Sequence, residues 1–139
     1  MKKFILISMV FVCLIVIFMF SSESGEVSME TTIKVSNVIN YENDNFFILR
    51  KCGHFIEFCI LEVCIISLIS CFRVVDFKCF IISLIFCLLY AFSDEIHQLF
   101  VIGRSARIMD VCIDFCGSIV GGLFFLVVYY VSNECLSKK

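Results

Sequence analysis

The sequence contains no proline, no tryptophan and only 6 glycines among its 139 residues. Collagen-like chains and low-complexity chains rich in glycine and proline are therefore excluded. Charge is scarce as well, since Asp, Glu, Lys and Arg together make up 17% of the chain. Disorder is excluded because disordered chains combine high charge with low hydrophobicity. The formal net charge of -2 gives no reason to expect a nucleic-acid partner.

Apolar residues take the place of the missing polar ones. They make up 61% of the chain, and its mean hydropathy is +1.05. A soluble globular domain is nearer half apolar and a quarter charged. The composition therefore predicts a single-domain integral membrane protein over residues 1–139.

Four apolar stretches are long enough to cross a bilayer as helices, which takes about 20 residues. We expect these helices at about 4–20, 51–72, 79–100 and 111–131. The first could instead be a signal peptide, but no small-x-small cleavage site follows Phe20, which favours a retained helix. Residues 21–45 are polar and contain no spanning run. The predicted fold is an all-α, four-helix transmembrane bundle with this long polar loop between helices 1 and 2.

Four passes place both termini on one side of the membrane. Basic residues are almost evenly divided between the two sides, but those on the side of the termini lie in very short segments. The leading Lys2-Lys3 pair also favours a cytoplasmic N-terminus under the positive-inside rule. We therefore expect a multi-pass protein of the cell membrane with cytoplasmic N- and C-termini.

Most polar residues of the predicted helices fall at the opposite, extracytoplasmic face. Charged groups within a membrane are costly unless they are paired or hydrated, so we expect these side chains to face one another in a pocket. The set consists of Lys51, His54, Glu57, Asp94, Glu95, His97, Gln98, Arg104, Asp110 and Asp114. In the fourth helix, Asp110, Asp114, Gly117 and Gly121 share one face. Gly117 and Gly121 form a G-x-x-x-G pattern, which permits close helix packing and carries both carboxylates inward.

Some of these charges have a simpler interpretation. Lys51 and Arg107 could extend to the headgroup region by snorkelling, and the whole set could be an ion-pair network that only holds the helices together. Asp114 is too short to snorkel. Glu62 lies about 12 Å deeper than His54 by helix rise, so it must be neutralised, paired or hydrated.

Two strings in the sequence resemble the VanZ-like family of bacterial membrane proteins. One is S-D-E-I-H-Q at 93–98, followed by the Gly-Arg pair at 103–104 and by Asp110 and Asp114; the other is R-K-x-x-H-F-x-E at 50–57. A weaker match is S-S-E-S-G at 21–25. The resemblance implies a cell-envelope protein associated with low-level teicoplanin resistance, but it implies no particular reaction.

The chain departs from the family pattern at three positions. Ile102 stands where proline is usual, Phe58 where tyrosine is frequent, and Glu62 where a small residue is common. The turn after the third helix should therefore be less rigid, because proline fixes its own backbone angle. The charged set is unaffected by these changes.

The leading hypothesis is that the pocket binds or modifies an envelope lipid, a lipid-linked precursor or a glycopeptide antibiotic. Its binding residues would be Lys51, Gln98, Arg104, Asp110 and Asp114. The alternative is a membrane-surface hydrolase or transferase acting on a lipid-linked phosphate held by cations such as Arg104 and Lys51. The candidate acid–base residues are His54, Glu57, Asp94, Glu95 and His97. The chain contains no G-x-S-x-G nucleophile motif.

Metal and redox chemistry find less support in the sequence. Histidines and carboxylates such as His54, Glu57, Glu95 and His97 bind divalent metals elsewhere, but their spacing matches no closed template and H-E-x-x-H is absent, so no metal site is predicted. No cofactor is indicated. The 10 cysteines all lie in or beside apolar stretches rather than in the polar loop, which favours free thiols over disulfides.

Overall fold

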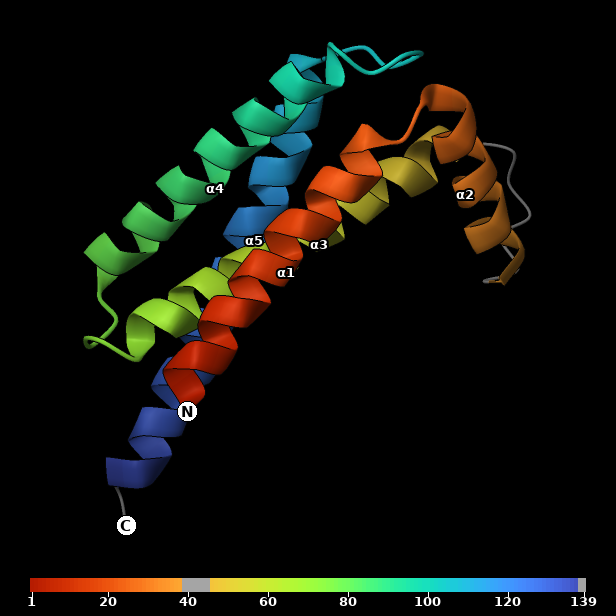
Figure 1. The fold of residues 1–139 in the computed structure, drawn as a ribbon. Helices are drawn as coiled ribbons and strands as arrows, with labels where there is room; N and C mark the ends of the chain where they lie inside the picture. The colour runs from red at the N-terminus through yellow and green to blue at the C-terminus, as the bar shows by residue number, and fades with distance from the viewer. Residues whose placement is uncertain (39–45, 138–139) are drawn as a thin grey trace.

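The computed structural model describes residues 1–38 and 46–137, and within them it consists of five α-helices without strands (Figure 1). They are α1 (Lys2–Ser22), α2 (Gly25–Val38), α3 (Phe46–Ser70), α4 (Phe77–Gln98) and α5 (Ile108–Ser137). Four of them, α1, α3, α4 and α5, are long and apolar enough to cross a membrane. The prediction of an all-α chain with four long apolar helices is confirmed.

The prediction of a long polar loop at 21–45 is wrong over its described part. α1 continues to Ser22 and α2 occupies Gly25–Val38, while residues 39–45 lie outside the described residues. The segment is polar but well suited to a helix. The Ser24 hydroxyl accepts a hydrogen bond from the Val27 amide at 3.4 Å, and Glu30 and Lys34 pair one turn apart at 2.8 Å. The segment is too polar to cross a membrane, but this does not prevent it from forming a helix outside the membrane.

The long helices alternate in direction. Figure 1 shows α1 running from the N-terminal end to the far end, α3 returning, α4 crossing again and α5 returning, so both termini lie at one end. The turn between α3 and α4 lies at this same end. There Asp76 begins α4 as its N-cap and accepts a 2.9 Å hydrogen bond from the Cys79 amide. Hydrogen bonds from Cys79 lower the pKa of the exposed Asp76 carboxyl.

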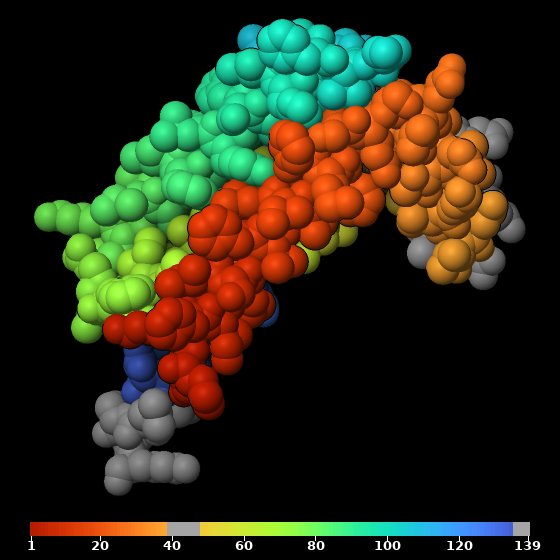
Figure 2. Space-filling model, in the orientation of Figure 1, coloured from red at the N-terminus to blue at the C-terminus, as the bar shows by residue number. Residues whose placement is uncertain are grey.

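α3 is the central helix, and it contacts each of the other four. One core cluster lies among α1, α3, α4 and α5, and a second joins α3, α4 and α5 near the α3–α4 turn. Outside these clusters, large apolar side chains are exposed along every long helix. Figure 2 shows α1 crossing one face of the molecule diagonally, with α4 along its flank and α2 beyond its C-terminal end. An apolar exterior around an inner core is what a bilayer requires of a helical bundle.

α5 packs directly against the backbone of α3. A Cβ atom added at Gly117 would collide with the Phe55 carbonyl oxygen, and one added at Gly121 would collide with the Cys59 carbonyl oxygen. These two glycines are therefore the close-approach points that the G-x-x-x-G pattern predicts. Toward the N-terminal end of α5, the same helix face contains Asp114 and Asp110. The two carboxylates are thereby directed toward α3.

Candidate functional site

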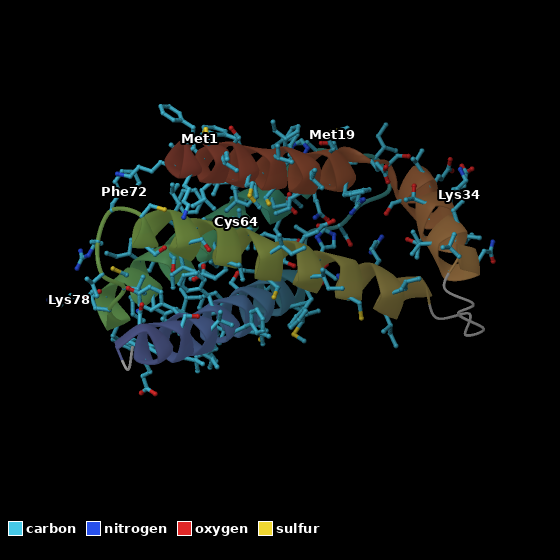
Figure 3. The ribbon with its side chains drawn as sticks, turned by 90° about the horizontal axis from the view of Figure 1, so that it is seen from below. Met1, Met19, Lys34, Cys64, Phe72 and Lys78 are labelled. Atoms are coloured by element: carbon cyan, nitrogen blue, oxygen red, sulfur yellow. The ribbon has the colours of Figure 1, made fainter. Side chains whose placement is uncertain are left out.

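The predicted polar residues meet at the end of the bundle opposite the termini. This polar end is formed by the junction of α1 with α2, the first turns of α3, the last turns of α4, the connection at 99–107 and the start of α5. Near Met19, side chains bearing nitrogen and oxygen point into the space between α1 and α3 (Figure 3). The polar end contains two arrangements, an inner network between α3, α4 and α5 and a pocket beneath α2.

The inner network is centred on an ion pair between Lys51 of α3 and Asp110 of α5. Their side chains are only 10% and 13% exposed. Lys51 therefore points into the bundle, and the snorkelling interpretation is wrong for this residue. The Glu95 carboxylate of α4 accepts a 2.8 Å hydrogen bond from the Arg107 backbone amide, which ties the connection before α5 to α4.

Two further carboxylates complete the inner network. Asp94 accepts a 3.0 Å hydrogen bond from the Gln98 side-chain amide one turn later in α4. Asp114 is 2% exposed, and its Oδ1 has no hydrogen-bond partner among the described residues. It interacts electrostatically with Asp94, Glu95 and Asp110. The network thus concentrates acidic groups around a single ion-paired lysine.

His97 does not join the inner network. Its Nε2 lies 3.0 Å from the Ser22 hydroxyl, and its ring packs against Phe18 with 4.6 Å between centroids. Both partners belong to α1. The structure therefore separates His97 from His54, whose side chain faces Glu57.

The pocket beneath α2 has a volume of about 370 Å³. It lies between α2 and the first turns of α3, and the end of α1 and the connection before α5 complete its wall. Apolar walls come from Phe20, Val35, Leu49 and Ile56. The lining also contains the imidazole of His54 and the charged side chains of Glu23, Arg50, Glu57 and Arg104. Of the ten predicted site residues, His54, Glu57 and Arg104 line this pocket, and the other seven do not.

His54 and Glu57 form a pair in the pocket wall. The His54 Nδ1 and Glu57 Oε2 atoms are 3.7 Å apart, which is too long for a hydrogen bond. Both atoms are buried, and neither has a hydrogen-bond partner among the described residues. Buried polar atoms are nearly always paired, so this gap is a place where a ligand or a water could bind.

Arg104 joins the pocket to the bundle. Its Nη2 donates to the Phe20 carbonyl at 2.7 Å and its Nε to the Glu23 carbonyl at 3.0 Å, so the guanidinium satisfies the open C-terminus of α1. Burial and then the nearby charge of Arg50 lower the pKa of Arg104. A guanidinium nevertheless remains charged at neutral pH, because its ordinary pKa is so high.

The connection before Arg104 also holds the α1–α2 junction. The Gly25 amide donates to the Ile102 carbonyl at 3.1 Å. Gly103 adopts a φ of +76°, a conformation that favours glycine, and a Cβ added at Gly25 would collide with the Gly103 carbonyl oxygen. Ile102, which replaces the usual proline, thus sits in a turn that this backbone contact restrains.

Glu62 lies outside the polar end and is fully buried between α3 and α4. The Ser83 hydroxyl lies 2.5 Å from its Oε1, and the Cys87 thiol lies 3.2 Å from its Oε2. Its predicted depth required Glu62 to be neutralised, paired or hydrated. The structure shows it paired, through hydrogen bonds to uncharged groups. Glu62 takes no part in the pocket.

No group of three or more His, Cys, Asp or Glu side chains within the described part of the chain is arranged to hold a metal ion. The 9 cysteines with described side chains are all free thiols, and Cys135 lies outside them. Cys13 and Cys64 approach to 4.0 Å between sulfur atoms.

The sequence interpretation missed much of the pocket lining, including Glu23 and the apolar residues of α1 and α3. Two further omissions are Arg50 and the wall supplied by α2. A signal was present for both. Arg50 precedes His54 by four residues and so shares its helix face. Ser28, Thr32 and Val35 follow the spacing of one face of a helix, and all three line the pocket.

A comparison with protein-family models matches residues 4–129 to the family described as VanZ/LLP1. The match contains every residue of the inner network and of the pocket. Neither a curated protein nor a solved structure matched the chain.

Proposed function

The chain belongs to the VanZ/LLP1 family, and from this premise we propose that it is a cell-envelope membrane protein of bacteria that binds an amphiphilic ligand beneath α2. The ligand class is an envelope lipid, a lipid-linked envelope precursor or a lipid-tailed glycopeptide such as teicoplanin. A role in tolerance to such antibiotics follows from sequestering or modifying one of these molecules.

The observation that carries this proposal is the pocket of about 370 Å³ at the polar end. Its volume lies in the range of about 300–1,000 Å³ that small-molecule sites occupy. Its walls are largely apolar, with charged groups of both signs among them. Each buried methylene of a chain placed there contributes about 0.8 kcal/mol. Such a site suits a molecule with an apolar tail and a polar head.

We place the polar end on the extracytoplasmic side of the membrane, with both termini in the cytoplasm. The dense basic groups near the termini and the α3–α4 turn support this orientation. A fluorescent protein fused to the C-terminus should then fold and fluoresce, and alkaline phosphatase fused there should be inactive. The reverse pattern would overturn the orientation.

Gly53→Leu is expected to block the pocket without unfolding the protein. Gly53 lines the pocket, and a Cβ added there meets no atom within 4 Å. Leucine is also a better helix former than glycine. Its side chain would displace two or three methylenes of a ligand tail, which corresponds to roughly a tenfold or greater loss of affinity. Calorimetric titration of the purified chain with teicoplanin and with an acyl-free glycopeptide measures this loss.

Gly53→Ala is the matched control, because it adds a Cβ but leaves most of the pocket empty. It should keep both binding and the teicoplanin tolerance of cells that express the chain. Gly53→Leu should lose both at equal membrane levels. Binding of the acyl-free compound as tightly as of teicoplanin, or full binding by Gly53→Leu, would contradict a site for the tail of this antibiotic.

A catalytic function is the second candidate, and the His54 and Glu57 atoms that lack a hydrogen-bond partner in the pocket wall favour it. A histidine oriented by a carboxylate can accept a proton from an attacking group. Glu57→Gln keeps the size of the side chain but removes its charge. If the variant binds ligand normally and still abolishes tolerance, the pocket modifies its ligand; if tolerance persists, binding is sufficient.

A further inference from the structure

We infer that the pocket recognises a phosphate group on its amphiphilic ligand through Arg50 and Arg104. The inference rests on the proposed function and specifies the ligand class for that same site. In the sequence interpretation, Lys51 shared the phosphate with Arg104. The structure commits Lys51 to Asp110 in the inner network and places Arg50 in the pocket instead.

Arg50 and Arg104 line one pocket and act on each other electrostatically, while the carboxylates of Asp94, Glu23 and Glu95 partly offset this repulsion at Arg104. Like charges are held near each other in a partly buried site at an energetic cost, which an anion between them would relieve. Neither arginine forms a salt bridge with a carboxylate among the described residues, although other lysine and arginine side chains do. Arg104 uses its Nε and Nη2 for the carbonyl groups of Glu23 and Phe20 at the C-terminal end of α1, which leaves its Nη1 for a ligand.

Phosphate is the anion that this position favours. Arginine binds phosphate oxygens through paired hydrogen bonds, and two arginines can engage more than one oxygen. The pocket lies where the spanning part of α3 begins and that of α1 ends, and this is the level of lipid phosphates in a bilayer. A tail in the apolar part of the pocket would keep the phosphate near the arginines.

The pocket also contains carboxylates, Glu23 and Glu57, so its charged lining is balanced rather than purely basic. The Glu57 Oε2 atom lacks a hydrogen-bond partner and faces the His54 Nδ1 atom across 3.7 Å. An ammonium or hydroxyl group of the ligand could donate to this carboxylate. The geometry therefore points to a phosphate with a hydrogen-bond donor beside it, as in a phosphoethanolamine or hydroxyl-bearing headgroup.

Calorimetric titration of the full chain in an uncharged detergent tests this inference. The probes are dioctanoyl phosphatidylethanolamine, dioctanoylglycerol, which lacks the phosphate, and inorganic phosphate. The phospholipid should bind most tightly. Arg50→Gln should weaken its binding roughly 10- to 100-fold, as expected for a lost charge-assisted contact. Arg50 is the residue to change because Arg104 also holds α1.

Arg73→Gln is the matched control, since Arg73 lies exposed at the α3–α4 turn and pairs with Asp76 there. It should bind the phospholipid like the unchanged chain. Equal binding of the phospholipid and dioctanoylglycerol, or unchanged binding by Arg50→Gln, would overturn the inference. Inorganic phosphate that binds as tightly as the phospholipid would overturn the headgroup assignment in favour of free phosphate. If Gly53→Leu still blocks teicoplanin in these cases, the proposed function stands without phosphate recognition.

Discussion

Gly121→Ala is expected to destabilise the protein severely, by about 1–3 kcal/mol or more, because it inserts a methyl group into a backbone contact. The added Cβ would collide with the Cys59 carbonyl oxygen, and α3 cannot yield without moving away from α5. Gly117 makes the equivalent contact with Phe55 one turn earlier. Thermal unfolding of the purified chain in detergent, followed by helical circular dichroism, measures the effect.

Gly53→Ala in α3 is the control for Gly121→Ala in α5. The chemical change is identical, but Gly53 faces open space, and alanine stabilises a helix by up to about 1 kcal/mol relative to glycine. This variant should unfold at the same temperature as the unchanged chain or above it. Equal behaviour of the Gly121 and Gly53 variants would show that α3 and α5 do not touch through their backbones.

Lys51→Met is expected to cost about 3–5 kcal/mol, because it leaves the Asp110 carboxylate buried without its cation. Methionine keeps most of the length of the lysine stem, so the loss is mainly electrostatic. The double variant Lys51→Met/Asp110→Leu removes both charges and should recover much of the lost stability. A double-mutant cycle on the unfolding free energy isolates this coupling.

The result that would reject the ion pair is additivity. If the losses of unfolding free energy caused by the Lys51 and Asp110 changes simply add, each residue acts through other neighbours. A second comparison uses Glu30→Gln in α2, whose partner Lys34 is exposed. Loss of that surface pair should change stability by no more than about 0.5 kcal/mol.

The sequence was sufficient to predict the four membrane spans, because the spans depend on hydrophobicity alone. Four apolar runs became four long helices, and the motif strings at 50–57 and 93–104 identified the family that the comparison confirms. The functional role of the ten site residues stays a prediction. Their approach to one end of the bundle followed from the alternating direction of the four spans. This alternation places the start of α3, the end of α4 and the start of α5 at the same end.

Features that depend on side-chain direction were beyond the sequence interpretation. His97 belongs to the family motif, yet it packs on Phe18 and Ser22 of α1. Lys51 and Arg50 are neighbours in sequence, but a helix turns them about 100° apart, so one enters the inner network and the other the pocket. α2 was missed because its polar composition concealed a helix that forms against α3.

The contact between the Gly25 amide and the Ile102 carbonyl has a consequence for biogenesis. α1 and α2 are translated before α4, but the backbone that fixes their junction follows more than 70 residues later, as counting from Gly25 to Ile102 shows. The junction of α1 and α2 beside the pocket therefore reaches its final position late in synthesis. Until α4 has been inserted and its trailing connection has docked, a nascent chain can carry every pocket residue and still lack the pocket.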